Sequence, residues 1–185
     1  MISTNDMRPG QTLDIDGTLF TIINYQHVKP GKGQAFVKTK LKNLKSGGVV
    51  DKTFRADEKV NLAVLDKREM QFLYSDDAGL VFMDNETYDQ IHIDAELLGE
   101  SGKFLMDGTV CLVPMYEGTP VGADMPINVE QAIVETEPGA KGDRVSGALK
   151  PATVESGAVV QVPLFLENGD RIKIDTRTGE YMSRA

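Results

Sequence analysis

The chain has few of the residues on which most catalytic and metal sites depend. Its 185 residues include one cysteine, two histidines and no tryptophan. The single cysteine, Cys111, excludes an internal disulfide and suits a reducing cytoplasm, where we expect the protein to reside. So few histidines and cysteines leave little material for a zinc site or a nucleophile paired with a base. We therefore expect no metal and no cofactor.

Long hydrophobic runs are also missing. No apolar stretch approaches the ~18 residues that a membrane helix requires, and the N-terminus lacks the basic and apolar regions of a secretory signal. We therefore expect no membrane contact. The composition is otherwise that of a globular chain, with 41% hydrophobic and 26% charged residues. Eighteen glycines and eight prolines favour short strands and turns over long helices.

Charge is distributed unevenly along the chain, whose net charge is −8. Residues 1–64 carry ten basic and six acidic side chains, residues 65–128 carry three and thirteen, and residues 129–185 carry seven and nine. A basic segment followed by an acidic one predicts an oriented encounter with a polyanion. The alternative is that the acidic surface only keeps the protein in solution, and charge alone leaves both readings open.

Segment 1, residues 1–64, reads as a series of closely connected strands. Asp16-Gly17 separates two β-rich runs and predicts a hairpin. A long strand is expected at 34–44, and Ser46-Gly47-Gly48 predicts the turn into the next strand. Strands this short and closely linked are typical of a small SH3-like barrel.

Segment 2, residues 65–128, is the acidic part of the chain. It contains a hairpin signal at 71–84 and a helical stretch at 94–108, for which Asp94 is the expected N-cap. Strands on both sides of one short helix are compatible with a five-stranded OB-type barrel.

Segment 3, residues 129–185, has the same β-rich plan. A glycine-rich loop is expected at 138–152, and Asn168-Gly169 between two β-rich runs predicts a hairpin. We therefore expect an all-β fold of three small β-barrel domains, an SH3-like barrel at 1–64 followed by OB-type barrels at 65–128 and 129–185.

The loop between the two long strands of segment 1 is the most informative local feature. It consists of Lys29, Pro30, Gly31, Lys32 and Gly33. Pro30-Gly31 suits the central positions of a type II turn, which requires a positive φ at Gly31. Lys32 is flanked by two residues without side-chain bulk, so we expect it to project from the hairpin tip. A lysine in that position is accessible to a modifying enzyme or to a narrow cavity.

The strand after this loop alternates between lysines and apolar or small residues. One face carries Lys38, Lys40 and Lys42, and the other carries Val37, Thr39 and Leu41. Three lysines on one face form a basic row that leads away from the tip, which suits contact with a phosphate backbone. Two alternatives remain open, because Pro-Gly-Lys-Gly is also an ordinary turn and alternating lysines also protect edge strands from aggregation.

The remaining candidates are expected to be structural. His27 is read as a surface residue at a strand end rather than a phosphate ligand, and His92 as solvent-facing by alternation. Cys111 lies in an apolar run and is expected in the core. Asp76-Asp77 occupies a turn and lacks the ligand spacing of a calcium loop. The loop around Lys32 is not a phosphate-binding P-loop, and no arrangement of residues indicates an enzyme.

Four stretches of the chain resemble the bacterial translation elongation factor P family, in order and over the full length. They are KPGKGQAFVKTKLKNL (29–44), DKTFRADEKV (51–60), FMDNETYDQ (82–90) and the long block from Lys150 to Arg184. Residue 7 departs from the family pattern, since it is Met where an aromatic residue is common.

The resemblance implies a fold and a mode of action. Members of that family fold as three β-barrels in an L-shaped, tRNA-like arrangement, the first of KOW type. They bind the ribosome between the peptidyl and exit tRNA sites, beside the peptidyl-tRNA, and relieve stalling at consecutive prolines. We therefore expect a cytoplasmic monomer that acts by positioning the CCA end of the peptidyl-tRNA and is not an enzyme.

The resemblance also implies which residues act. Lys32 matches the tip lysine that many members carry in an extended form, with β-lysine or an aminopentanol chain, and so implies a lysine-modifying enzyme as a partner. The family's C-terminal G-E-Y-x-S-R motif matches here and implies contacts on the anticodon side. We expect the tRNA- or rRNA-binding residues to be Lys29, Pro30, Gly31, Lys32, Gly33, Lys38, Lys40, Lys42, Tyr181 and Arg184.

The alternative function is a general single-stranded nucleic-acid-binding OB protein. Such proteins combine a basic groove with aromatic stacking platforms. Here segments 2 and 3 are both net acidic, and aromatic residues make up only 6% of the chain. An enzyme hidden among the carboxylates of segment 2 is the third and weakest reading.

Overall fold

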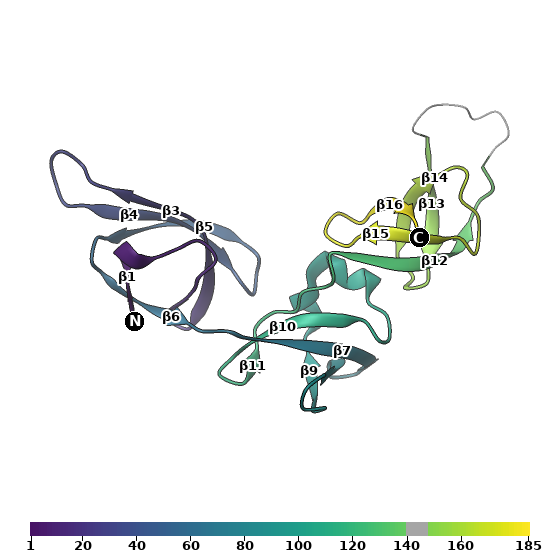
Figure 1. The fold of residues 1–185 in the computed structure, drawn as a ribbon, viewed down its shortest axis with the longest axis horizontal. Coiled ribbons are helices and arrows are strands. Elements are labelled where there is room, and N and C mark those ends of the chain that lie inside the picture. The colour runs from purple at the N-terminus through teal and green to yellow at the C-terminus, as the bar shows by residue number, and fades with distance from the viewer. Residues whose placement is uncertain (140–147) are drawn as a thin grey trace. The chain divides into compact units, whose positions relative to one another are not determined.

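The computed structural model describes residues 1–139 and 148–185, in which all regular structure is β except for two short 3-10 helices (Figure 1). The strands form three sheets of six, five and five strands. The expected all-β class is therefore confirmed. The chain forms two compact units, Met1–Lys67 with Pro114–Gly122, and Arg68–Val113 with Ala123–Ala185. The three-domain division at 1–64, 65–128 and 129–185 stays a prediction.

The first sheet has the order β1-β6-β2-β3-β4-β5. Its strands are β1 (Ile2–Ser3), β2 (Thr12–Ile15), β3 (Thr18–Val28), β4 (Phe36–Asn43), β5 (Val49–Arg55) and β6 (Lys59–Ala63), with the 3-10 helix η1 (Thr4–Asp6) after β1. The core of this sheet consists of Met7, Leu13, Ile22, Val37, Leu41, Phe54 and Val60.

The predicted Asp16-Gly17 hairpin joins β2 and β3. Both turn residues have positive φ, 51° at Asp16 and 86° at Gly17, and Ile15 pairs directly with Thr18. A two-residue turn with two positive φ values is the type I′ turn that Asp-Gly favours. The backbone N–H of Gly17 also donates to Asp14 Oδ1 at 2.9 Å, which further stabilises the turn.

The second sheet has the order β11-β10-β7-β8-β9. Its strands are β7 (Asp66–Asp76), β8 (Gly79–Asp84), β9 (Gln90–Ile93), β10 (Val110–Tyr116) and β11 (Thr119–Pro120), and the 3-10 helix η2 (Ala95–Phe104) follows β9. The expected hairpin joins β7 to β8, with Asp76 opposite Gly79. The helix starts at the predicted N-cap, because the carboxylate of Asp94 accepts from the backbone N–H of Glu96 at 3.0 Å.

The helix is shorter and tighter than the sequence predicts. It ends at Phe104 rather than at residue 108, and Gly99 interrupts it with non-helical angles, φ 62° and ψ −151°. Glycine adopts such angles at no steric cost and weakens a regular helix. The result is two short 3-10 turns instead of one α-helix.

The third sheet has the order β14-β13-β12-β15-β16. Its strands are β12 (Asn128–Thr136), β13 (Leu149–Val154), β14 (Val159–Pro163), β15 (Arg171–Asp175) and β16 (Glu180–Arg184). Part of the glycine-rich loop expected at 138–152 is strand, because β13 begins at Leu149. Residues 140–147 of that loop lie outside the described residues.

The hairpin predicted at Asn168-Gly169 is wrong. A turn does form there, with Gly169 at φ 91°, but the flanking strands β14 and β15 do not pair with each other. Instead the turn contacts β12, where Asn168 Oδ1 accepts from the N–H of Thr136 and the N–H of Gly169 donates to the carbonyl of Ile133, both at 2.8 Å. The side chain and backbone of the turn thus complete an irregular part of β12.

Phe104 connects η2 to the core of the third sheet. Its side chain is fully buried among Ile133, Val160 and other apolar residues of β12 to β15. Its carbonyl accepts from Gln131 Nε2 at 2.9 Å, and Gln131 is itself only 1% exposed. The second unit therefore has a core to which both the helix and the third sheet contribute.

Candidate functional site

The loop around Lys32 connects β3 and β4 and is exposed. Every residue from Lys29 to Gln34 is solvent-exposed, and within the described part of the chain the Lys32 side chain makes no hydrogen bond or ion pair. The loop is a bend rather than the expected type II turn. Gly33 carries the positive φ, 102°, and Gly31 does not. A Cβ at either glycine would meet open space, so the loop surrounds Lys32 with no bulk.

The alternation along β4 is as predicted. Val37, Thr39 and Leu41 are buried, while Lys38, Lys40 and Lys42 are exposed on the other face. Since β4 lies between β3 and β5, it is an internal strand (Figure 1). Protection of a sheet edge therefore does not explain the lysines, and the sequence-based alternative is wrong on this point.

Packing fixes the strands that carry the loop. Thr39 Oγ1 donates to the carbonyl of Lys52 at 2.8 Å, which links β4 to β5. The hydroxyl of Tyr25 on β3 donates to the carbonyl of Asn5 at 3.2 Å, and Thr4 Oγ1 donates to the carbonyl of Arg55 at 2.7 Å. These bonds hold the three strands on the barrel, so the exposed loop extends from a fixed base.

A shallow groove of about 380 Å³ lies beside the lysines of β4. Its lining residues are Asn24, Gln26, Lys38, Thr39, Lys40, Asp51, Lys52 and Thr53. Every lining residue has a polar or charged side chain, and the eight include three lysines and one carboxylate. Two lysines also lie over aromatic rings, Lys38 Nζ at 5.7 Å from the Phe36 centroid and Lys52 Nζ at 5.4 Å from that of Phe54. The arrangement suits a polyanion rather than an apolar ligand.

Asn24, Gln26, Asp51 and Thr53 are groove residues that the sequence reading missed. They lie on β3 and β5, and only strand pairing brings them beside the lysines. One signal was available, since pairing outward from the loop places Val28 opposite Phe36 and Gln26 opposite Lys38. The same extrapolation fails further along β3, where the register shifts between Ile22 and Asn24.

The C-terminal candidates, Tyr181 and Arg184, lie on β16 in the second unit, whereas the Lys32 loop belongs to the first. Tyr181 is partly buried and packs against the core of the third sheet. Arg184 is exposed, with its Nη2 at 3.5 Å from Asp170 Oδ1 and its guanidinium 6.0 Å from the ring centroid of Phe165. Arg184 is thus the more exposed of the two.

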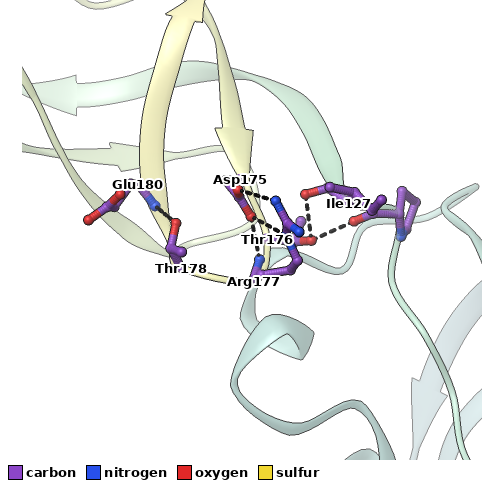
Figure 2. Close-up of polar contacts among 7 residues, drawn as sticks. Ile127, Asp175, Thr176, Arg177, Thr178 and Glu180 are labelled. Atoms are coloured by element: carbon purple, nitrogen blue, oxygen red, sulfur yellow. Dashed lines mark hydrogen bonds and ion pairs between the residues drawn. The ribbon is translucent and has the colours of Figure 1, made fainter. Parts of the chain in front are cut away.

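A polar cluster on the β15–β16 hairpin has no counterpart in the sequence reading (Figure 2). Asp175 accepts from Arg177 three times, from the backbone N–H at 2.8 Å, from Nε at 3.2 Å and from Nη2 at 3.0 Å. The bond to the guanidinium lowers the pKa of the Asp175 carboxyl, and the same contact raises the pKa of Arg177. The hydroxyl of Thr176 donates to the carbonyls of Pro126 and Ile127, so the hairpin fixes the segment that precedes β12.

Cys111 and His92 are placed as predicted, but His27 is not the surface residue that was expected, since its Nε2 is buried. Cys111 is fully buried, and burial raises the pKa of its thiol to about 11, so the reactive thiolate is disfavoured. His92 is exposed, with Nε2 at 2.8 Å from Asp76 Oδ2, and the hydrogen bond to His92 lowers the pKa of the Asp76 carboxyl. His27 is half-buried on β3, and its Nε2 has no hydrogen-bond partner among the described residues.

No group of three or more His, Cys, Asp or Glu side chains among the described residues could hold a metal ion. No helix in residues 1–139 or 148–185 is long and apolar enough to cross a membrane.

Comparison with protein families gives three matches in chain order. Residues 3–60 match the elongation factor P KOW-like domain, residues 65–123 the elongation factor P OB domain, and residues 129–184 the elongation factor P C-terminal domain. These matches confirm the predicted KOW-like and OB barrels.

Curated relatives match over the whole chain. The chain is 54% identical over 185 residues to elongation factor P of Acidothermus cellulolyticus, covering 100% of this chain and 99% of the relative. It is 56% identical over 184 residues to elongation factor P of Syntrophomonas wolfei, covering 100% of both.

Solved structures show likeness in fold. Translation initiation factor 5A from Methanococcus jannaschii aligns with a TM-score of 0.55 and 22% identity, covering 64% of this chain and 88% of the other. A protein of the same factor family from Naegleria fowleri aligns with a TM-score of 0.53 and 13% identity, covering 68% and 94%.

Proposed function

The chain belongs to the elongation factor P family and is thus a translation elongation factor, and on that premise we propose that it binds the ribosome between the peptidyl and exit tRNA sites. There it contacts the peptidyl-tRNA, with the Lys32 loop beside the CCA end. It stimulates peptide-bond formation and relieves stalling at consecutive prolines. The protein acts as a cytoplasmic monomer without a cofactor.

The observation that carries this proposal is the exposed Lys32 at the end of a basic strand. The loop places one cation beyond the barrel, and Gly31 and Gly33 add no side chain beside it. Behind the tip, Lys38, Lys40 and Lys42 form a row of exposed cations on β4. A narrow tip with a basic strand behind it suits entry beside a nucleic-acid strand.

The mechanism is positional rather than chemical. The pyrrolidine ring of proline fixes φ and restricts the backbone of the reacting residue, so the reactive geometry is rarely reached. A factor that holds the CCA end in that geometry lowers the entropic part of the barrier. A tenfold gain in rate needs only ~1.4 kcal/mol, and one charge-assisted hydrogen bond supplies ~1.5–3 kcal/mol. The ribosome forms the bond, and the protein is not an enzyme.

Exposure of Lys32 also supports its modification. A lysine-modifying enzyme needs an accessible ammonium group without bulky side chains beside it. Both conditions hold for Lys32, which is exposed and lies between two glycines. Extension with β-lysine or an aminopentanol chain would keep a positive charge and add reach. In the second unit, Arg184 and Tyr181 supply RNA contacts on the anticodon side.

Replacement of Lys32 tests the proposal. In a purified translation system, Lys32→Ala should slow synthesis through Pro-Pro-Pro about tenfold or more, since it removes the cation that lies between the two glycines of the loop. Thermal unfolding should not change, because within the described chain the side chain makes no polar contact. The measurement is the rate of full-length product formation.

Lys45→Ala is the matched control. Lys45 is an exposed lysine in the turn between β4 and β5 of the same barrel, so its removal should leave the polyproline rate unchanged. Equal rates for wild type and Lys32→Ala would contradict the proposed role of the loop.

A further inference from the structure

We propose that the groove on the outer face of β3, β4 and β5 binds the sugar–phosphate backbone of an RNA strand and distinguishes it from DNA through Asp51, Asn24 and Gln26. The inference rests on the proposed function, which supplies an RNA partner, and adds a means of recognition to it. The three strands lie side by side in the first sheet (Figure 1).

Strand register arranges the groove in two rows across the three strands. The rows are Gln26–Lys38–Thr53 and Asn24–Lys40–Asp51, from β3 to β4 to β5. Each row has an amide on one side, a lysine in the centre and an oxygen acceptor on the other side. All six side chains are exposed, so both rows are open to a ligand.

The central lysines favour a polyanion. Among the described residues, neither Lys38 nor Lys40 has a carboxylate within 4.0 Å. They are two residues apart on one strand, so their Cα atoms are separated by about 6.7 Å. Such cations neutralise successive phosphates but do not distinguish one nucleic acid from another.

Asp51 distinguishes the sugar. It is exposed beside Lys40 and has no ion-pair partner among the described residues. An ionised carboxylate only accepts hydrogen bonds, and it repels a phosphate. In a phosphodiester backbone the only donor is the 2′-hydroxyl, which DNA lacks. Asp51 therefore gains a bond with RNA and only repulsion with DNA.

The amides on β3 complement this carboxylate. Asn24 Oδ1 accepts from the backbone N–H of Tyr25 at 2.7 Å, which orients the amide and leaves Nδ2 as the free donor. The Gln26 side chain, opposite Lys38, has no hydrogen bond in the described chain and offers both a donor and an acceptor. A 2′-hydroxyl can accept from the amides and donate to Asp51. The side chains on β3 and β5 together therefore complement the 2′-hydroxyl of ribose.

Direct binding to short hairpins tests the proposal with the full-length protein. The probes are an RNA hairpin, the DNA hairpin of the same sequence and a 2′-O-methyl RNA hairpin, at an ionic strength near 50 mM. The wild type should bind RNA about tenfold more tightly than DNA, as one to two hydrogen bonds allow. It should bind the 2′-O-methyl hairpin more weakly than the unmodified RNA hairpin, because methylation removes the donor to Asp51.

The variants should change the preference in opposite ways. Asp51→Ala should strengthen DNA binding and leave RNA binding nearly unchanged, while Asn24→Ala with Gln26→Ala should weaken RNA binding and leave DNA binding unchanged. Lys38→Ala with Lys40→Ala should lower the slope of log K against log salt by about 1.8 for both hairpins, at about 0.9 per phosphate contact. Controls for charge and amide are Asp6→Ala, Lys59→Ala and Asn61→Ala, all exposed in the same unit.

Several results would overturn the proposal. They are equal affinity for RNA and DNA, an equal gain for both on Asp51→Ala, no binding of any hairpin, or equally tight binding of an acidic peptide. These outcomes are separable from the proposed function. A groove that discriminates RNA while Lys32→Ala leaves polyproline synthesis intact would refute the function and keep the groove, and the reverse pattern would refute only the groove.

Discussion

Two loops of this protein present a cation at the end of a β-hairpin, and the two are built in opposite ways. Lys32 between β3 and β4 is exposed, and its side chain has no polar partner in the described chain. Arg177 between β15 and β16 is also exposed, 68% for the side chain, yet Asp175 holds its backbone and its guanidinium. One cation is free to meet a partner and the other is held by the protein itself.

The difference extends to the glycines of the two loops. Gly33 and Gly179 both have positive φ, 102° and 76°. A Cβ at Gly33 would meet nothing, whereas a Cβ at Gly179 would lie 3.4 Å from Lys103 Nζ and 3.8 Å from the Phe104 ring. The β15–β16 loop thus lies beside η2, whose Phe104 belongs to the core of the third sheet. The Lys32 loop thus lacks the contacts within its own unit that the β15–β16 loop makes.

The largest effect is expected at Thr176, whose hydroxyl ties this loop to Pro126 and Ile127. Thr176→Val should lower the free energy of unfolding by about 2 kcal/mol, because the buried Thr176 side chain loses the hydroxyl that donates to the carbonyls of Pro126 and Ile127. Denaturant unfolding measures the change. Thr178→Val is the control, since Thr178 is exposed, and it should cost under about 0.5 kcal/mol. Equal costs at both positions would show that the loop is not held in this way.

A matched pair of glycine substitutions sharpens the comparison. Gly179→Ala should cost about 1–2 kcal/mol, because the hairpin fixes a left-handed backbone at this position, φ 76°, which an alanine adopts only with strain. Gly33→Ala should cost under about 0.5 kcal/mol, since a loop without packing can relax to negative φ. Calorimetry on the two variants checks this. A larger loss at Gly33 would mean that the Lys32 loop is held more firmly than its contacts indicate.

Sequence reading worked where structure is local. The Asp16-Gly17 turn depends on two residues that accept positive φ, and the exposure of Lys38, Lys40 and Lys42 depends on strand alternation alone. Within the Lys32 loop the same reasoning failed at Gly31, because Pro30, Gly31 and Gly33 are all turn formers. Nothing local decides which glycine adopts the positive φ.

It failed where distant segments compete for a partner. Asn168-Gly169 is a strong hairpin signal, but β12 takes the place beside β15, and β14 pairs with β13 instead. Phe104 reads as the apolar end of a helix, and only the tertiary fold places it in the core of the third sheet. The groove residues Asn24 and Asp51 were missed for the same reason, since only pairing across β3, β4 and β5 brings them beside Lys40.

The smallest effect is expected in the pH dependence of stability that arises from the ion pair between Asp175 and Arg177. Hydrogen bonding to Arg177 keeps the pKa of Asp175 below its usual value of 3.8 in the folded state. A lowered folded pKa stabilises the protein at pH above the unfolded value, and this contribution disappears as the pH falls through the folded pKa. Asp175→Asn removes it, so the loss of stability below about pH 4 should be shallower than in the wild type. Urea unfolding between pH 3 and 7 measures how the free energy of unfolding depends on pH in the wild type and in the variant. An identical loss of stability at low pH in both proteins would mean that Arg177 is as unconstrained as Lys32.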